Sequence, residues 1–536
     1  MSFKTNEYQQ ITIDDKFSSL SPRTQKIVMK SWAKDFAEIV FPAINEKRFA
    51  VLYSDHAFSR PNNPINVTVG ALMLKEMLGI SDDELMDSIC CDIRFQYALH
   101  TTSFAEQPIS DRTFSRFRER LYNYEVETGI DILKDEMKSL SDTYAKYLNL
   151  NSNLKRMDSL MIASNCKRMS RLEIIYTVVS NIIKLIERVG EKELIPSEME
   201  HYLNTDDRND VIYYSKNDDI SDRLTQTIAD AEKLQKIMDN DIWLDFSEYH
   251  LLVRVLKEQA QEDESGCLKP KNKKEILPDS LQNPSDPDAT YRSKAGKDHK
   301  GYVGNIVETV GENGCSLISD VSYDKNNHSD SAFCKEYLEK QTGETKETLI
   351  ADGAYSGKDN NNLAEAKNVE LVTTALTGRQ PDAIMADFKL SIEGTKVDCC
   401  PMNHEPIKSS YYENTGMCRA VFDKKFCENC KNRTRCKAKI QNKTATVMVS
   451  VKMTERAQYL KKLSSSEYIT LTRKRNGVEG IPSVLRRKYH IDNIPVRGLL
   501  RSKTFFLFKT GAYNIRKLIK HLPKLREESA LNPVIG

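Results

Sequence analysis

The chain has 536 residues, 39% of them hydrophobic and 29% charged, a composition that builds packed cores and excludes a largely disordered protein. It contains no run of about eighteen apolar residues and no signal-like N-terminus, so the sequence predicts a cytoplasmic protein without membrane spans. The net charge of +2 conceals a basic stretch at residues 461 to 526, where seventeen Lys and Arg accompany three acids and favour a polyanionic partner.

Residues 1–150 are predicted to be helical. Runs at 67–78 and 82–90 carry apolar residues at helical spacing, and Ser81 is placed to cap the second run. A further helix is predicted after Ser110, and its arginines either present cations to DNA, as on a recognition helix, or form the solvated face of a helical bundle. Both interpretations remain open. The candidate DNA-binding residues of this helix are Arg112, Arg116 and Arg118.

Strands and helices alternate in the middle of the chain. Asp158 interrupts an apolar, strand-like run, and a mainly helical segment at about 170–265 follows it. Residues 263–300 are rich in Pro, Lys and Asp and are predicted to form a loop. Runs at 302–310 and 316–323 then predict a hairpin. After a helix, a second strand-like run ends in Asp352, and one more helix and a strand follow.

This order of strand, hairpin, helix, strand, helix and strand predicts an α/β fold with a ribonuclease-H-like mixed sheet covered by helices. In such a sheet the strands that carry Asp158 and Asp352 can lie side by side. We expect the segment at about 170–265 to be a helical insertion, because its apolar residues follow a helical period. The expected parts are a helical 1–150, the sheet core at 151–380, a Cys-rich insertion at 381–450, and a basic helical region at 451–536.

Three acids stand in contexts that suit metal-dependent phosphoryl transfer. Asp158 and Asp352 belong to strand-like runs, and Glu479, expected on a helix, follows several bases. Carboxylates bind hard cations, and two such ions about 3.5 to 4 Å apart can activate an attacking oxygen and stabilise a leaving one. We therefore predict that the three acids bind Mg²⁺ or Mn²⁺. The bases near Glu479 that are assigned to DNA binding are Arg475, Arg486, Arg487 and Lys488.

Six of the twelve cysteines lie between residues 399 and 436. In a large chain without a secretion signal, a Cys-x-x-Cys pair accompanied by further thiols is typical of a structural zinc site. Buried free thiols are the alternative interpretation. The expected zinc ligands are Cys400, Cys427, Cys430 and Cys436, with Cys399, His404 and Cys418 as competitors for the outer positions.

Taken in order, these motifs resemble the DDE transposases of bacterial insertion sequences, in the group whose last acid lies in a Tyr-Arg-Glu-Lys signature. The N-terminal helical segment from Gly70 to Arg118 resembles the N-terminal domain of many such transposases. The other matching stretches are Arg156-Met-Asp-Ser159, Cys166-Lys-Arg-Met-Ser-Arg171, Tyr302-Val-Gly-Asn-Ile-Val307, Ile350-Ala-Asp-Gly-Ala-Tyr355 and Arg475-Asn-Gly-Val-Glu479.

The resemblance implies that Asp158, Asp352 and Glu479 form a catalytic triad and that Arg475 is the signature arginine. Counting from Glu479, the signature's Tyr position holds Thr472 and its Lys position holds Arg486. The implied enzyme cleaves transposon ends and joins their 3′-hydroxyls to target DNA by two-metal-ion chemistry.

Its implied partners are double-stranded DNA, namely terminal inverted repeats and target DNA, and further copies of the chain in a homodimer or higher oligomer. The implied location is the bacterial nucleoid. Two alternatives are a metal-dependent nuclease of the same fold and a catalytically inactive DNA-binding regulator.

Overall fold

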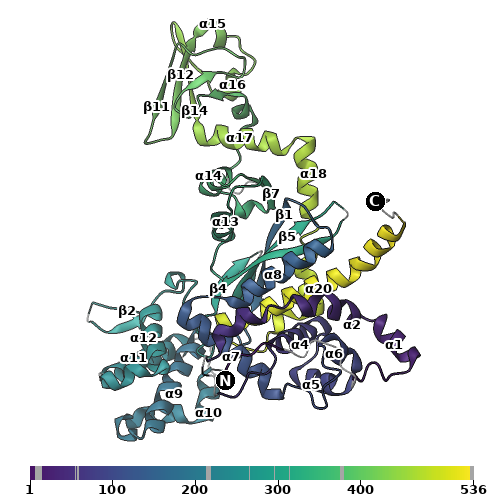
Figure 1. The fold of residues 1–536 in the computed structure, drawn as a ribbon. Helices are drawn as coiled ribbons and strands as arrows, with labels where there is room; N and C mark the ends of the chain where they lie inside the picture. The colour runs from purple at the N-terminus through teal and green to yellow at the C-terminus, as the bar shows by residue number, and fades with distance from the viewer. Residues whose placement is uncertain are drawn as a thin grey trace. The chain divides into compact units, whose positions relative to one another are not determined.

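The computed structural model describes residues 1–6, 15–54, 56, 59–212, 219–238, 240–264, 266–294, 296–312, 314–374 and 379–531 (Figure 1). The chain divides into two compact units. The first unit comprises Met1–Asn151, Ser159–Ser329 and Pro482–Gly536, and the second comprises Ser152–Asp158 and Asp330–Ile481. These units cut across the four parts expected from the sequence, because strand β1 (Leu154–Ala163) contributes residues to both.

The N-terminal region is helical, as predicted. Ser81 and Glu84 form a capping box at the start of α5, and α4 ends at Gly79 in the left-handed conformation that favours glycine. The helices are α1 (Pro22–Met29), α2 (Trp32–Asp35), α3 (Phe41–Ala43), α4 (Ile65–Leu78), α5 (Asp82–Cys91), α6 (Ile93–Ala98), α7 (Asp111–Thr128) and α8 (Ile132–Tyr147).

The C-terminal helix α20 (Leu499–Leu531) packs against α4, α7, α8 and strand β6 of the same unit. Lys509 of α20 forms a buried ion pair with Glu76 of α4, at 2.6 Å between Nζ and Oε2. The ring of Phe506 lies so close to Gly304 that a Cβ built on this glycine would be 2.6 Å from it. Helix α20 is therefore part of the core of the first unit, and the charges on its inner face are neutralised by the N-terminal helices.

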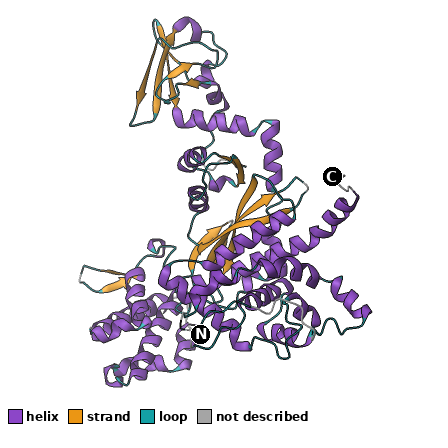
Figure 2. Cartoon of the chain, in the orientation of Figure 1, coloured by secondary structure: helices purple, strands orange, loops and turns teal. Residues whose placement is uncertain are grey.

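Strands from both halves of the chain build the mixed sheet (Figure 2). In the first unit, β5 pairs antiparallel with β4 and β6 and neighbours β1; in the second unit, β1 pairs parallel with β7, and β7 with β8. This arrangement confirms the predicted α/β class with a ribonuclease-H-like mixed sheet. The strands are β4 (Thr290–Lys294), β5 (Lys297–Val310), β6 (Ser316–Lys325), β7 (Glu347–Ala351) and β8 (Val369–Thr373).

A helical insertion with its own core follows β1. The predicted core face of α9 is buried, with Leu172, Ile175, Val179, Ile182, Ile183 and Ile186 at most 6% exposed. The segment at 263–300 is not a continuous loop as predicted, since β3 and β4 form within it, although its Pro and Asp content disfavours strands. The insertion contains α9 (Arg171–Val189), α10 (Thr205–Ile212), α11 (Ile220–Ile237), α12 (Ser247–Gln259), β2 (Ala260–Glu262) and β3 (Leu268–Pro270).

The second unit adds helices and a small sheet to its part of β1. The Cys-rich segment forms an antiparallel sheet of order β11-β12-β14-β13 around the buried side chains of Phe388, Cys418 and Phe422. No helix among the described residues is both long and apolar enough to cross a membrane. The remaining elements of this unit are α13 (Asp330–Glu339), α14 (Lys358–Ala366), β9 (Lys389–Leu390), β10 (Val397–Cys399), β11 (Lys408–Tyr412), β12 (Met417–Asp423), α15 (Lys424–Cys427), α16 (Arg433–Cys436), β13 (Lys439–Ile440), β14 (Thr444–Ser450), α17 (Val451–Leu463) and α18 (Ser466–Arg475).

Candidate active site

Asp158 and Asp352 are brought to the same level by the pairing of two parallel strands. The register of β1 and β7 runs to Arg156 opposite Ile350, and two further residues along each strand are Asp158 and Asp352. Neighbouring strands are about 4.8 Å apart, and residues at one level of a parallel pair project on the same side. The predicted adjacency of the two acids is thus a direct consequence of the strand register.

Glu479 reaches this pair from a turn and not from a helix as expected. Residues 476–479 form the turn between α18 and α19 (Gly480–Tyr489). Arg475, the last residue of α18, precedes Glu479 by four positions. The turn lets both side chains approach the strand ends from the same segment.

The guanidinium of Arg475 lies among all three carboxylates. Its Nη1 is 2.9 Å from Oε1 of Glu479, and its Nη2 is 3.8 Å from Oδ2 of Asp352 and 3.9 Å from Oδ1 of Asp158. The side chains of Arg475 and Asp158 are 14% and 16% exposed, whereas those of Asp352 and Glu479 are 48% and 57% exposed. The Arg475 guanidinium therefore lies near three acids, of which Asp158 is the most buried and Asp352 and Glu479 are more exposed.

Arg156 fixes the end of α18 against β1. It is 8% exposed, and its Nη1 donates a hydrogen bond of 2.6 Å to the carbonyl of Lys474. A Cβ added to Gly477 would lie 2.0 Å from this same nitrogen, so a larger residue here would require the Arg156 guanidinium to move. Sequence reasoning missed this contact. Arg156 was visible as part of the Asp158 motif, but its partner is 318 residues away.

Thr472, which stands at the Tyr position of the signature, bonds within its own helix. The Thr472 hydroxyl donates to the carbonyl of Ile469 in its own helix, at 3.0 Å. The tyrosine one helical turn earlier, Tyr468, is 5% exposed and packs against Ile350 and Val372. That ring belongs to the core of the second unit and does not replace a tyrosine at the signature position.

A groove of about 490 Å³ begins just after Asp352 in the chain. It is formed by the loop at Ser356, the first turns of α14, the hairpin end at Tyr411 and one face of α17. Its charged lining residues are Lys358, Lys452, Glu455 and Arg456, which leave an excess of two positive charges. Such a lining suits a polyanion.

The four expected zinc ligands are close enough to influence one another. Burial raises the pKa of the Cys427 thiol, and Cys400 and Cys430 raise it further. Burial raises the pKa of Cys436 to about 11, with further contributions from the other three thiols. Cys418, in β12, is fully buried in the same core cluster as Cys436, and Cys400 and Cys427 pack against this cluster. His404 stacks on Phe426 at 4.2 Å between ring centroids.

Within the part of the chain that the structure describes, no group of three or more His, Cys, Asp or Glu side chains has an arrangement that would hold a metal ion. For the three acids, the position of the Arg475 guanidinium gives a physical reason, since each carboxylate is directed at this cation. The acids and the four thiols are gathered, but neither set has closed into a coordination geometry.

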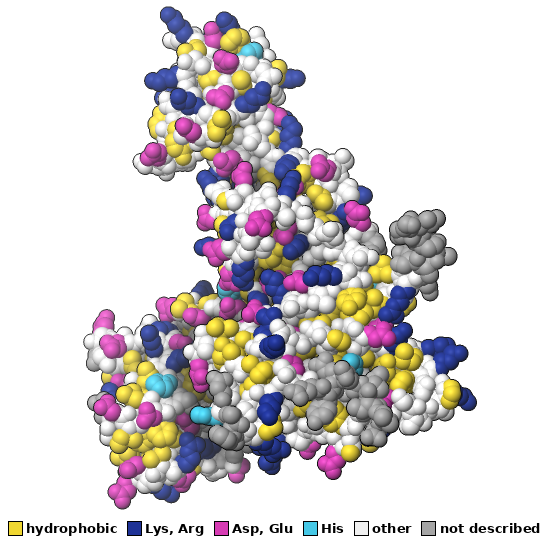
Figure 3. Space-filling view, viewed as in Figure 1, with side chains coloured by type: hydrophobic (Ala, Val, Ile, Leu, Met, Phe, Trp, Pro, Cys, Tyr) yellow, Lys and Arg dark blue, Asp and Glu magenta, His cyan; other side chains and the backbone are white. Residues whose placement is uncertain are grey.

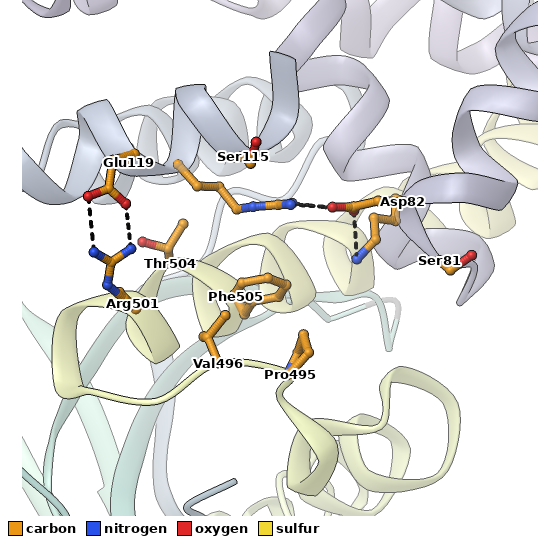
Figure 4. A pocket seen from close by; sticks show the side chains of 11 residues that line it. Ser81, Asp82, Ser115, Glu119, Pro495, Val496, Arg501, Thr504 and Phe505 are labelled. Carbon is orange, nitrogen blue, oxygen red and sulfur yellow. Dashed lines mark hydrogen bonds and ion pairs between the residues drawn. The ribbon is translucent and has the colours of Figure 1, made fainter. Parts of the chain in front are cut away.

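The arginines expected on a recognition helix differ in their surroundings. Arg112 and Arg116 of α7 are exposed, whereas Arg118 forms an ion pair with Asp82 and lies 5.2 Å from the ring centroid of Phe505. Arg118, Asp82 and Phe505 line the pocket in Figure 4, where Glu119 and Arg501 form a second ion pair. Arg118 therefore makes its contacts within the first unit. Of the three arginines predicted to bind DNA, Arg112 and Arg116 remain exposed.

The three basic residues predicted to bind DNA after Glu479 lie on α19. Arg487 and Lys488 are exposed on α19. Arg486 donates to the carboxylate of Asp492 at 3.1 Å and to the carbonyl of Met161 at 3.0 Å. On the face in Figure 3, Lys and Arg are interspersed with Asp and Glu, so any DNA path must be defined by local clusters of bases.

Two family models match the chain. A model described as Transposase DDE domain matches residues 399–519, and one described as Transposase domain (DUF772) matches residues 27–120. Both matches are to transposase models and support a transposase, a DNA-processing enzyme. More specifically, they support a DDE-class transposase of an insertion element. No curated protein and no solved structure gives a match.

The DDE match includes the Cys-rich segment, Arg475 and Glu479, while Asp158 and Asp352 lie outside both matches. The first two acids of the site are thus supported by strand register and by their distances to Arg475.

Proposed function

We propose that this transposase cleaves transposon ends and joins the freed 3′-hydroxyls to target DNA at Asp158, Asp352 and Glu479. One observation carries the proposal: three acids from separate segments, 194 and 127 positions apart in the sequence, lie within 4 Å of one cationic side chain. Like charges are seldom gathered in this way without a functional reason, because their mutual repulsion must be offset.

The donor set fits a hard divalent cation. Asp158, Asp352 and Glu479 would hold Mg²⁺ or Mn²⁺, since carboxylate oxygens are the preferred ligands of these ions. When bound, the metal ions would polarise the scissile phosphodiester and lower the pKa of the attacking hydroxyl. Asp158, the most buried of the three acids, would be the most fixed ligand, and the two exposed acids would adjust to the substrate.

Arg475 has two consecutive roles in this proposal. Without metal, its guanidinium neutralises part of the charge of the three acids. With the carboxylates engaged elsewhere, its planar fork can bind a phosphate oxygen of the DNA strand. The contact of Arg156 with the Lys474 carbonyl would keep the end of α18 in place during this exchange.

We further propose that Cys400, Cys427, Cys430 and Cys436 hold a structural zinc ion. The proposal is supported by the raised pKa values of Cys427 and Cys436, to which neighbouring thiols contribute. A divalent metal binds thiolates and would offset the effects that disfavour ionisation of Cys427 and Cys436. This ion would stabilise the Cys-rich sheet and take no part in the chemistry.

The DNA contacts are proposed to involve the exposed bases of α7 and α19 and the groove beside Asp352. Arg112 and Arg116, with Arg487 and Lys488, are exposed cations that suit the phosphate backbone. Because joining requires a transposon end and target DNA to be held together, we propose a homodimer or higher oligomer that works on the bacterial nucleoid.

The test is joining of a labelled transposon end to plasmid DNA in Mg²⁺. The ends would be taken from the terminal inverted repeats that flank the coding region. We expect joined product with the native chain and none with Asp352→Asn. Cleavage without joining would instead establish a nuclease of the same fold. DNA binding without either reaction would establish an inactive regulator.

A further inference from the structure

We propose that a small basic pocket at the end of β1 binds one phosphate group of the DNA backbone. The pocket belongs to the first unit, whereas the three acids belong to the second. It lies where the chain leaves β1 at Ser164, and its cationic lining includes Lys167, Arg168 and Lys300. Lys167 and Arg168 belong to the motif at 166–171, which has no role in the proposed chemistry. The inference rests on the proposed function for the source of the phosphate.

Backbone carbonyls orient the two principal cations of the pocket. Nη2 of Arg168 donates to the carbonyl of Asp298 at 3.2 Å, and Nζ of Lys300 donates to the carbonyl of Met169 at 3.1 Å. A carbonyl fixes the position of a cation without cancelling its charge. Lys167 differs, because it forms an ion pair with Glu173 at 3.0 Å. Arg168 and Lys300 therefore supply most of the charge that an anion would meet.

Several cations act on His299 of β5, which lines the pocket. Burial lowers the pKa of His299, and the charges of Arg486, Arg168, Lys294 and Lys297 lower it further. Burial also lowers the pKa of Lys300; Arg168 lowers it further, whereas Asp298 and Glu173 raise it. The cations around His299 would attract an anion to this wall of the pocket.

The walls of the pocket are fixed before any ligand arrives. Nδ2 of Asn283 donates to the Lys167 carbonyl at 2.9 Å, and the main-chain nitrogen of Ser164 donates to the Lys300 carbonyl at 3.1 Å. Gly301 packs so closely on β1 that a Cβ would lie 2.3 Å from the carbonyl oxygen of Ile162. Little ordering is therefore required on binding, which favours affinity.

The volume limits what the pocket can accept. It measures about 120 Å³, which equals roughly four water molecules at about 30 Å³ each. One tetrahedral oxyanion fits this space. A DNA phosphate and free inorganic phosphate share this chemistry. In a DNA-processing enzyme, the continuous supply of backbone phosphates makes DNA the ligand we propose.

The experiment measures how the affinity of the full chain for a duplex oligonucleotide of arbitrary sequence depends on salt. Each phosphate contact adds about 0.9 to the slope of log K against log salt concentration. We expect the double variant Arg168→Gln, Lys300→Gln to lower the slope by about 0.9. The matched control is Arg188→Gln, Lys192→Gln, which removes the same two charges from exposed positions of the helical insertion and leaves the slope unchanged.

Arg168→Gln alone guards against misfolding of the double variant, because Arg168 is exposed; it is expected to weaken binding in the same direction. An equal slope in the pocket variant and the control would overturn the proposal. Competition by millimolar inorganic phosphate in the native chain, with no change of slope in the pocket variant, would show a free-anion site and also overturn it.

The failure of the proposed function is distinguishable from these outcomes. Asp352→Asn is expected to retain the native slope and to lose joining. The pocket variant could show the lower slope while the native chain neither cleaves nor joins DNA. That result would refute the proposed chemistry and still support the phosphate pocket.

Discussion

Removal of the Arg475 guanidinium is predicted to tighten Mg²⁺ binding at the three acids by about tenfold, which corresponds to about 1.4 kcal/mol. The reason is competition: in the structure each acid is already directed at Arg475, so a metal ion must displace this cation. The variant Arg475→Gln keeps a polar side chain of similar length and removes the charge.

The magnitude follows from the exposure of the pairs. Asp352 and Glu479 are 48% and 57% exposed, and such ion pairs contribute roughly 0.2–1 kcal/mol each because water screens them. The pair with Asp158 is shielded, but at 3.9 Å it is not a hydrogen bond, and desolvation offsets much of its attraction. A total of about 1–2 kcal/mol for displacing Arg475 is therefore reasonable.

The assay is titration calorimetry with MgCl₂ on the native chain, on Arg475→Gln and on Arg473→Gln. Arg473 is exposed on the same helix, so its removal changes the net charge equally without touching the acids. We expect tighter binding in Arg475→Gln alone. Unchanged or weaker binding in that variant would refute the reasoning, because it would mean that Arg475 arranges the acids for metal and does not compete with it.

Three further predictions concern the turn, the thiols and the basic pocket. Gly477→Ala should destabilise the second unit by about 0.5–1.5 kcal/mol in denaturant unfolding and reduce joining, because its Cβ would displace the Arg156 guanidinium from its hydrogen bond to the Lys474 carbonyl; Gly480→Ala, with no atom within 4 Å of its Cβ, should behave like the native chain. Zinc should co-purify with the native chain and be lost in Cys436→Ser but not in Cys399→Ser, as measured by elemental analysis; a metal-free native chain would contradict the zinc proposal. The pKa of His299, lowered in the folded chain, means that its contribution to stability is present above the unfolded pKa and is lost as the pH falls through the folded pKa. Arg168→Gln should raise the pKa of His299 in an NMR titration, and an unchanged titration would show that Arg168 does not act on the pocket.

The sequence predicted the two strand acids better than the third. Asp158 and Asp352 follow from strand order, since parallel neighbours in a sheet place corresponding residues at one level. Glu479 could be associated with this site by its basic context, but its place in a turn depends on Gly477, whose role appears only when Arg156 packs against it. Local patterns carry no information about a partner 318 residues away.

The fate of Arg118 illustrates the same limit. A row of arginines on a predicted helix indicates a basic face, but helical spacing cannot show which members of the row meet acids from other helices. Arg118 forms an ion pair with Asp82 of α5 and lies over the ring of Phe505 of α20, while Arg112 and Arg116 stay exposed. Only the packing shows which of the predicted arginines are already engaged within the protein and which stay exposed.

The gathering of the three acids supports the site independently of any family resemblance. An ordinary surface acid lowers its energy by pairing with its own base or by facing water. Here Asp158, Asp352 and Glu479 share one guanidinium, although other bases lie nearby in the sequence at Arg473 and Lys474. Carboxylates that meet at one guanidinium repel one another, which disfavours folding and favours a divalent cation. That balance is expected where stability has been given up for function.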